Sequence, residues 1–337
     1  MLISELEPLT SQKWTTACLD EAHTIKNRNT KSSTAAMKLD ANYRIILTGT
    51  PVQNHLGELW NLFQFVNPGL LGSYEHFSER FLSSDSPSSK EDLKRIVSPF
   101  ILRRTKSEVI QELPDKEEII LPVPLSDIET AEYEVIRREA KAELETASTV
   151  NVGALSMITK LRMKACGESK LEALIEKLPP IVEGGNSVLV FSQFTSFLAR
   201  VKQKMEEVGL TDYLYLDGQT PVAKRQMLVD CFQRGEKKIF LISLKAGGLG
   251  LNLTGANYVI HLDPWWNPAI EQQATDRAYR IGQTQKVTVY HLIASQTIEE
   301  KILRLHGTKR DLADTILEGA NISSRLTPSE LLEMLGD

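Results

Sequence analysis

Short apolar runs that end in polar or glycine-rich turns recur through the second half of the chain. Segments with the spacing of amphipathic helices separate these runs, so that strand and helix alternate. This alternation is typical of a parallel sheet with helices on both faces, and it predicts a complete α/β domain over residues 186–300. The predicted strands are 186–193, 213–218, 237–248, 257–263 and 286–293.

A shorter version of the same pattern lies near the N-terminus. Residues 14–19 and 43–51 are apolar runs that end in polar turns, and residues 30–39 have helical spacing between them. We interpret residues 1–54 as part of another α/β lobe, whose site lies at the carboxyl ends of its strands. Residues 55–113 change to helical spacing and predict a helical insertion.

The remaining segments connect or follow these lobes. Residues 114–185 carry a proline-flanked strand at 117–123 and then helices, which we interpret as a crossing between the lobes. Ser126 stands three residues before Glu129, the spacing of a capping box at the start of a helix. Residues 301–337 predict a helical tail.

Composition excludes several classes of protein. Of 337 residues, 42% are hydrophobic and 25% are charged, so the chain is not globally disordered. The net charge of −5 excludes a histone-like basic protein and leaves nucleic-acid binding only as a local basic groove. The three scattered cysteines (Cys18, Cys166 and Cys231) exclude a disulfide framework or a structural zinc site. Without a signal peptide or a long apolar run, we expect a soluble protein inside the cell, in the cytoplasm, nucleoid or nucleus.

Two groups of residues suggest hydrolysis of a nucleoside triphosphate, which needs a metal on the phosphates, an oriented water and cations on the developing charge. The adjacent Asp20 and Glu21 follow a predicted strand, although a bare acidic pair is also an ordinary start of a helix. Gln273, Arg277 and Arg280 are spaced to share one face of a helix, although a solvated basic face has the same spacing.

Five short strings in a fixed order closely resemble the Swi/Snf-type DNA translocases, which are helicase-like ATPases of superfamily two. They are LDEAH at 19–23, LTGTPVQN at 47–54, VLVFSQF at 188–194, SLKAGGLGLNL at 243–253 and DRAYRIGQTQKV at 276–287. Three more point to the Swi/Snf group rather than to unwinding helicases: FILRRTK at 100–106, LDG at 216–218 and DPWWNP at 263–268. The resemblance implies a complete second RecA-like lobe at 186–300 and a truncated first RecA-like lobe at 1–54, followed by the helical insertion.

The resemblance also assigns roles at the nucleotide, which it implies to be ATP. It implies that Asp20 holds Mg²⁺ through water and that Glu21 polarises the attacking water. It makes Arg277 and Arg280 arginine fingers on the phosphates, a role worth about 10³–10⁵ in rate. The other residues that it places in catalysis, at the nucleotide or in coupling the nucleotide to DNA are Gln273, Gly250, Asn252, His23, Thr48, Gly49 and Thr50.

Double-stranded DNA is the second partner that the resemblance implies, and it places DNA on the glycine-rich loop at 243–253. Backbone amides of such a loop, together with a lysine, bind phosphate oxygens, although a lone Lys-Ala-Gly-Gly is more simply a flexible loop. Trp265 and Trp266 belong either to the core or to a wedge against DNA, and the sequence does not separate the two. The implied DNA contacts are Ser192, Gln193, Ser243, Lys245, Gly247, Gly248 and Trp265.

A phosphate-binding loop of the form G-x-x-x-x-G-K-[ST] is absent from the sequence. Only 19 residues precede Asp20, fewer than the roughly 30 residues of a βαβ unit that would carry such a loop. We therefore expect the C-terminal portion of a translocase, a monomer that cannot hydrolyse ATP alone and has an unpaired apolar strand edge in its first lobe. The alternatives are a non-catalytic relic that binds DNA or a partner, a split enzyme, or an unrelated doubly wound fold such as a nucleotide-sugar transferase.

Overall fold

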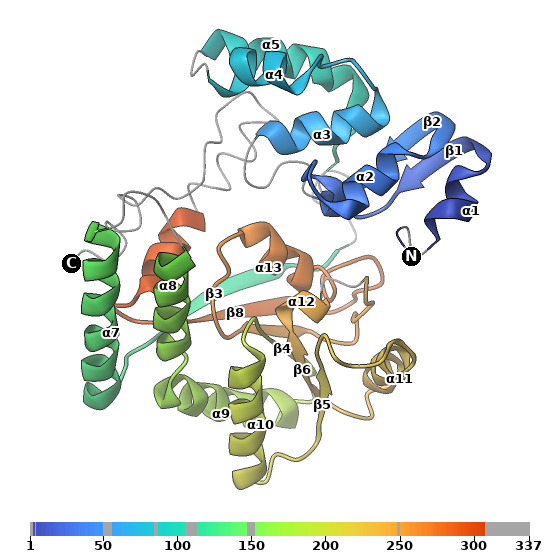
Figure 1. Ribbon diagram of the computed structural model, residues 1–337. Coiled ribbons are helices and arrows are strands. Elements are labelled where there is room, and N and C mark those ends of the chain that lie inside the picture. The colour runs from blue at the N-terminus through green and yellow to red at the C-terminus, as the bar shows by residue number, and fades with distance from the viewer. Residues whose placement is uncertain are drawn as a thin grey trace. The chain divides into compact units, whose positions relative to one another are not determined.

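The protein divides into two compact units, each with a parallel sheet of its own (Figure 1). The computed structural model describes residues 3, 5–49, 56–83, 87–104, 113–146, 152–247 and 250–306. Within this part of the chain, the first unit ends at Arg103 and the second begins at Arg104. None of the described helices is long and apolar enough to cross a lipid bilayer.

The first unit contains the strand–helix–strand pattern that the sequence predicts. Strands β1 (Lys13–Leu19) and β2 (Asp40–Ile46) pair in parallel, with Ala17 opposite Arg44. The hydroxyl of Thr30 accepts the N–H of Ser33 at 3.2 Å and so caps the helix between the strands. The remaining elements here are α1 (Leu6–Thr10), η1 (Ala22–Ile25) and α2 (Lys31–Met37).

The two-stranded sheet is covered on one face only by its own unit. Ile46 packs with α2 and α3 residues, whereas Tyr43, Ile45 and Leu47 on the other face are exposed. Because strand side chains alternate between faces, β2 presents an apolar row to one side. Among the described residues, β1 and β2 pair only with each other.

The predicted helical insertion is confirmed for the residues that the structure describes. A cluster of apolar side chains, including Leu59, Phe63, Phe77 and Leu93, joins its helices. The helix that begins at Tyr74 changes from an α-helical to a π-helical turn after Phe77. The elements are α3 (Leu56–Val66), α4 (Tyr74–Phe77), the π turn η2 (Ser78–Leu82), α5 (Pro87–Val97) and η3 (Ser98–Phe100).

The second unit is built on a six-stranded, fully parallel sheet in the order β3-β8-β7-β4-β6-β5. Two of its interior strands, β4 and β6, are buried along their whole length, as apolar runs of a doubly covered sheet require. The predicted α/β class is therefore confirmed. The strands are β3 (Lys116–Val123), β4 (Val188–Ser192), β5 (Tyr213–Leu216), β6 (Ile239–Ser243), β7 (Tyr258–His261) and β8 (Val287–Ala294).

Strand β3 extends this sheet from outside the range 186–300. It lies in the segment that the sequence suggests as a crossing, yet it pairs with β8 along its whole length. Pro122 lies opposite Ile293 in this pairing. A proline lacks a backbone donor and is tolerated in a strand at the edge of a sheet, the position that β3 occupies.

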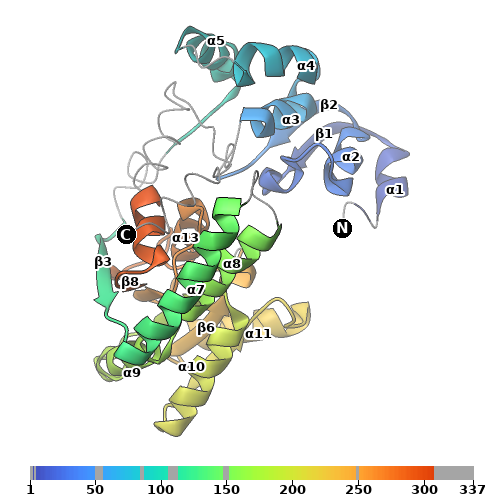
Figure 2. The same cartoon turned by 60° about the vertical axis from the view of Figure 1, so that its left-hand side comes forward.

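Helices cover both faces of the second sheet. One apolar cluster joins the sheet to α9 and α10, and another joins it to α11 and α13. The long helices α7 and α8 lie side by side and form a third cluster with residues 298–306 (Figure 2). The helices are α7 (Asp127–Thr146), α8 (Val152–Ala165), α9 (Glu168–Glu183), α10 (Thr195–Glu207), α11 (Val222–Gln233), α12 (Leu244–Gly247) and α13 (Pro268–Thr275).

The predicted capping box at the start of α7 is confirmed in both directions. The N–H of Ser126 donates to Oε2 of Glu129 at 3.1 Å, and the N–H of Glu129 donates to Oγ of Ser126 at 3.3 Å. The same carboxylate also accepts the backbone N–H of Ser169 at 3.2 Å. Because Ser169 lies in the first turn of α9, Glu129 joins the starts of two helices.

Candidate functional site

The acidic pair lies where β1 ends. Oδ1 of Asp20 accepts the backbone N–H of Glu21 at 2.8 Å, and Asp20 is exposed. Glu21 has a left-handed backbone, with φ of 49°, which is uncommon for a residue with a side chain. Its Oε2 lies 3.2 Å from Nδ1 of His23, so the residue predicted to polarise water and a residue predicted to couple nucleotide to DNA are in direct contact.

The LTGTP string begins beside this acidic pair. The N–H of Leu47 donates to the carbonyl of Leu19 at 2.8 Å, and the N–H of Ala22 donates to the carbonyl of Leu47 at 3.0 Å. These bonds place Thr48 and Gly49 next to the turn that carries Glu21, at the carboxyl ends of β1 and β2. Thr50 lies outside the described residues.

In the second unit, the residues predicted to contact DNA begin where β4 and β6 end. Ser192 pairs with Ser243 in the sheet, and both side chains are buried. The hydroxyl of Ser192 donates to the carboxylate of Asp263, which also accepts the N–H of Gln193 at 3.2 Å. Ser192 therefore ties the FSQF string to the DPWW string, and a DNA contact from it stays a prediction.

Lys245 is the exposed basic residue of this sheet edge. It lies in α12, a single turn that follows β6 directly, and Gly247 ends that turn. Gly248 lies outside the described residues. Gly250 has a left-handed φ of 73°, a conformation that glycine adopts without strain, and the chain then turns back toward the buried Leu253.

The prediction that Gln273, Arg277 and Arg280 share one helix face is wrong. Helix α13 ends at Thr275, so Gln273 is helical, whereas both arginines lie in the turns that follow. Beyond Thr275 the chain continues in turns: the N–H of Arg277 donates three residues back, to the carbonyl of Ala274, at 3.1 Å, and the carbonyl of Arg277 accepts the N–H of Leu253 at 2.9 Å.

The same contact brings the predicted nucleotide-side residues together. Gly250 and Asn252 lie on the segment that ends at Leu253, and the carbonyl of Arg277 is bonded to that segment. The guanidinium of Arg280 reaches to 3.5 Å from the carbonyl of Leu251. The glycine-rich loop and the two arginines thus form one site at the carboxyl ends of the strands.

Gln283 holds this site together, and sequence reasoning missed it. Its buried side-chain amide donates to the carbonyls of Ala256 at 2.7 Å, Thr254 at 3.1 Å and Ala278 at 3.2 Å. Its Oε1 accepts the N–H of Gln285 at 2.9 Å. Because the partners are main-chain groups, no side-chain pattern in the sequence indicates this role.

For the two tryptophans, the geometry favours a place in the core. Trp265 packs against the cluster under α11 and α13, and Trp266 packs against the cluster of α7 and α8. The guanidinium of Arg162 lies over both rings, 5.6 Å and 5.1 Å from their centroids, and donates to the carbonyl of Pro264. The cation–π contacts thus anchor the DPWW string to α8.

Two family models match the chain. The SNF2-related domain matches residues 1–170, and the helicase conserved C-terminal domain matches residues 169–282. The putative ATP-dependent helicase/translocase YwqA of Bacillus subtilis is 39% identical over 98% of this chain and 38% of its own length. The SWI/SNF-related matrix-associated actin-dependent regulator of chromatin subfamily A member 1 of Mus musculus is 33% identical over 99% of this chain and 35% of its own length. The chain therefore spans little more than a third of these relatives.

Solved structures agree with this assignment. The SWI2/SNF2 ATPase core of Sulfolobus solfataricus, solved in complex with double-stranded DNA, is 35% identical with a TM-score of 0.52. The match covers 94% of this chain and 72% of that one. The C-terminal part of the Fun30 ATPase domain shares the fold at 24% identity and a TM-score of 0.51, over 60% of this chain and 97% of that one. With both domains matched in order, the chain belongs to the Swi/Snf family of ATP-dependent helicases.

Proposed function

We propose that this chain supplies the second lobe, which binds DNA, and the water-polarising glutamate of a motor that uses ATP hydrolysis to move along double-stranded DNA. The observation that carries the proposal is the site at the carboxyl ends of β4, β6 and β7. There the exposed Lys245 follows β6 directly, and the Leu253–Arg277 backbone bond ties the end of the glycine-rich segment to the turns that carry Arg277 and Arg280. We propose that groups for binding DNA phosphates and cations for the phosphates of ATP share one edge of the sheet. Such an arrangement would let a change at the nucleotide reach the bound DNA.

The acidic pair fits a magnesium ion that is bound together with ATP. The described residues hold no cluster of three or more His, Cys, Asp or Glu side chains that could bind a metal alone. Mg²⁺ at nucleotides is held by one or two carboxylates plus phosphates and water, so the single exposed Asp20 suits it. The bound ion would neutralise charge on the phosphates.

Glu21 is the residue that we propose to polarise the attacking water. Its carboxylate is half-exposed at the strand end, and its contact with His23 fixes one oxygen. Because Ala22 of the same turn is bonded to Leu47, a shift of the LTGTP loop would move this carboxylate. This is the coupling role that we propose for His23, Thr48, Gly49 and Thr50.

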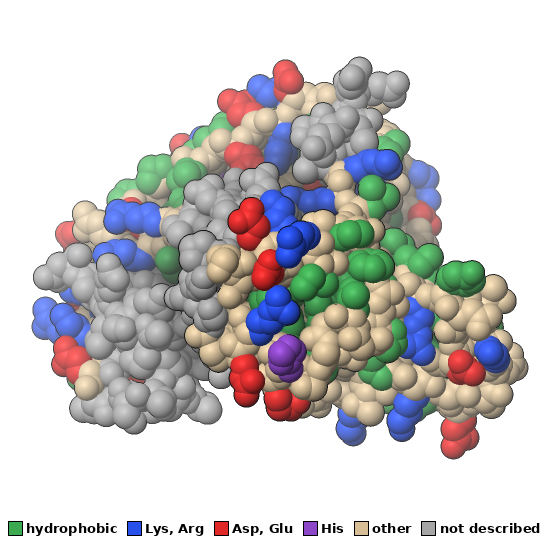
Figure 3. All heavy atoms as spheres, turned by 90° about the horizontal axis from the view of Figure 1, so that it is seen from above, with side chains coloured by type: hydrophobic (Ala, Val, Ile, Leu, Met, Phe, Trp, Pro, Cys, Tyr) green, Lys and Arg blue, Asp and Glu red, His purple; other side chains and the backbone are tan. Residues whose placement is uncertain are grey.

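We propose that DNA lies on the glycine-rich loop of the second unit. Lys245 offers a charge to a phosphate, and the amides of Gly247 and Gly248 offer donors. The face drawn in Figure 3 carries Lys and Arg side chains among Asp and Glu side chains rather than a continuous basic surface. This mixed charge favours a local DNA-binding site over a broad basic one. Gln193 and Ser243 complete the proposed contact set.

Hydrolysis needs a phosphate-binding loop, and the 337 residues contain no G-x-x-x-x-G-K-[ST] string. We therefore propose that this chain alone, as a monomer, binds DNA without turning over ATP. This missing string also favours the second candidate, a protein that binds DNA or a partner and never hydrolyses ATP.

The experiment compares ATP hydrolysis and DNA binding in a protein that joins this chain to its phosphate-binding loop. Glu21→Gln is expected to abolish DNA-stimulated hydrolysis and to leave affinity for duplex DNA unchanged. Glu75→Gln, an exposed change in the helical insertion, serves as the control and should keep both. Retained turnover in Glu21→Gln would contradict the assignment, and absence of turnover in the unmutated protein would favour the second candidate.

A further inference from the structure

Strand β5 lies at one edge of the six-stranded sheet and, among the described residues, pairs only with β6. Tyr213 and Tyr215 point to the face covered by α10, whereas Leu214 and Leu216 pack on the face covered by α11. The two helices therefore lie on opposite sides of the strand. In a strand, the N–H and C=O groups of successive residues point alternately to its two edges. Half of those of β5 therefore point to its outer edge, where no strand pairs with them.

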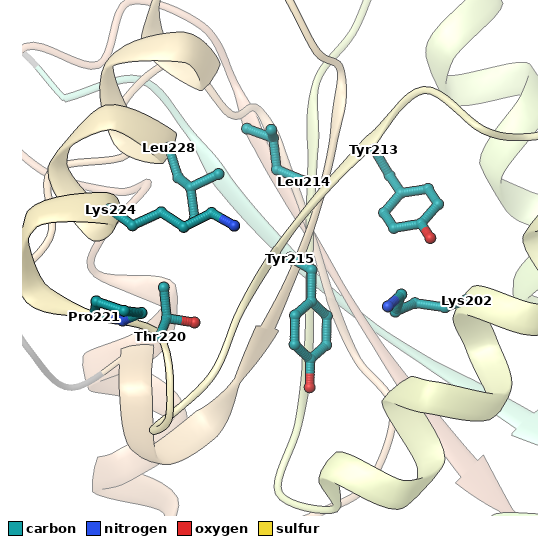
Figure 4. Close-up of a pocket in the computed structure, with 8 residues that line it drawn as sticks. All are labelled: Lys202, Tyr213, Leu214, Tyr215, Thr220, Pro221, Lys224 and Leu228. Carbon is teal, nitrogen blue, oxygen red and sulfur yellow. The ribbon is translucent and has the colours of Figure 1, made fainter.

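A cavity of about 340 Å³ opens along this edge (Figure 4). Tyr215 lies in its middle, with Lys224 of α11 on one side and Lys202 of α10 on the other. A space of this volume admits a few side chains of an extended segment but not a folded domain. Its lining consists of Lys202, Tyr213, Leu214, Tyr215, Thr220, Pro221, Lys224 and Leu228.

The two lysines are the charges that this groove presents. Nζ of Lys202 lies 4.9 Å from the ring centroid of Tyr215, and Lys224 is exposed. The nearby carboxylates are already engaged: Glu206 accepts the hydroxyl of Tyr213 at 2.6 Å, and Asp217 accepts that of Tyr215 at 3.0 Å. Among the described residues, neither lysine has a carboxylate within ion-pair distance.

We infer that this groove binds an extended acidic segment of a partner protein, which adds to the sheet as a strand beside β5. The unpaired backbone groups of β5 supply the hydrogen bonds of strand addition. Side chains of the added strand alternate between the two helices, so carboxylates reach Lys202 on one side and Lys224 on the other.

Two observations favour an acidic strand over other occupants. Lysines beside an edge strand ordinarily disfavour the addition of a neutral or basic strand, because the added strand would leave their charge unpaired. An acidic strand is attracted to the same lysines. Nucleic acid would also pair with lysines, but it needs free aromatic faces for its bases. Tyr213 and Tyr215 are instead packed against the core cluster beneath α10, and their hydroxyls are in use.

The test uses the whole chain and a fluorescein-labelled peptide that repeats Glu-Glu-Val-Val, so that an extended strand carries glutamates on both faces, with binding followed by fluorescence anisotropy. The double variant Lys202→Glu/Lys224→Glu is expected to weaken binding about tenfold or more. Lys141→Glu, an equal change at an exposed lysine of α7, should stay within about twofold of wild type. The side chains of Lys202 and Lys224 are half-exposed and exposed, respectively. If circular dichroism shows that the double glutamate variant is unfolded, Lys202→Gln/Lys224→Gln replaces it.

A second arm separates strand addition from loose charge attraction. Two peptides of the same sequence carry backbone N-methyl groups on alternate residues, one set for each edge of the strand. One of them is expected to lose binding, because its methylated edge faces β5, and the other to retain it. Equal binding of both, no binding of the parent peptide, or no loss in the lysine variants would overturn the inference. So would a labelled DNA duplex whose affinity depends on Lys202 and Lys224 when that of the peptide does not.

Discussion

The backbone N–H of Leu253 donates to the carbonyl of Arg277 across 2.9 Å, and this bond joins two strings that lie far apart in the sequence. Helix α13 ends at Thr275, before this bond, and the guanidinium of Arg280 lies 3.5 Å from the carbonyl of Leu251. The proposed arginine fingers are therefore positioned by the glycine-rich loop rather than by a helix. A change in that loop should move the arginines, which is the geometry that coupling of DNA and nucleotide requires.

Removing the Gln283 side-chain amide tests how this contact is maintained. Gln283→Leu leaves three carbonyls without their buried donor, and the expected loss in free energy of unfolding is about 2–4 kcal/mol. Urea denaturation of the chain measures it. Gln285→Leu, at an exposed neighbour, should change stability by less than about 0.5 kcal/mol, and equal stability of both variants would contradict the role of Gln283.

The carboxylate of Glu129 makes stability depend on acid pH. Burial alone would raise the pKa of this carboxylate. Hydrogen bonds from Ser169 and Ser126 outweigh burial and lower the pKa to about 2. A lowered pKa gives stability that is present above about pH 4.5 and is lost as the pH falls toward 2. The expected contribution is about 1–2 kcal/mol after solvent screening. The free energy of unfolding of Glu129→Gln, measured between pH 4.5 and 2, should not show this loss. A pH profile parallel to that of wild type would show that these hydrogen bonds do not lower the pKa of Glu129.

Gly167 tests the same helix junction without changing a charge. A methyl group at this position would overlap Oε1 of Glu129, which is held by its hydrogen bonds to both helix starts. Gly167→Ala should therefore destabilise the chain by about 1–3 kcal/mol. Thermal unfolding measures it, with Gly218→Ala as a control because nothing lies within 4 Å of a methyl group there. Equal melting temperatures would argue that the junction adapts freely.

Lys170 and Glu299 form an ion pair that is fully buried, with Nζ and Oε2 2.5 Å apart. The ammonium group also donates to the carbonyl of Leu262 at 2.6 Å. Lys170→Met leaves the buried Glu299 without its cation and should cost about 3–5 kcal/mol in urea unfolding at a pH above 7, where Glu299 of the wild type is ionised. Lys177→Met, at an exposed position on the same helix, should lower the free energy of unfolding far less. Equal losses in the two variants would contradict a stabilising role of the pair.

Glu299 adds a pH dependence of the opposite sign to that of Glu129. Burial raises its pKa to about 7, because the nearby Lys170 compensates only in part. A raised pKa gives stability that is complete below about pH 4.5 and is lost as the pH rises through 7. Between these values, wild type should lose about 3 kcal/mol relative to Glu299→Gln, while Glu300→Gln should follow wild type. Parallel curves for wild type and Glu299→Gln would contradict this assignment.

Local signals in the sequence predict much of this molecule, and long-range contacts account for what they miss. The strands and the Ser126–Glu129 capping box follow from spacing within a few residues. The position of β3 beside β8 depends on pairing across the chain, for which the strand itself carries no signal. Helix α13 ends at Thr275, and Arg277 lies in a turn bonded to Leu253 from another part of the chain, so helical spacing alone placed Arg277 wrongly.

The proposed binding of duplex DNA through Lys245 of the second unit should be visible in the salt dependence of DNA affinity. Fluorescence anisotropy with a labelled duplex gives the affinity of the chain across a series of salt concentrations. The account predicts that Lys245→Ala weakens binding at every salt concentration and lowers the salt slope by about one. Lys141→Ala, at an exposed lysine of α7, should match wild type. An affinity and slope in Lys245→Ala equal to those of wild type would contradict the account.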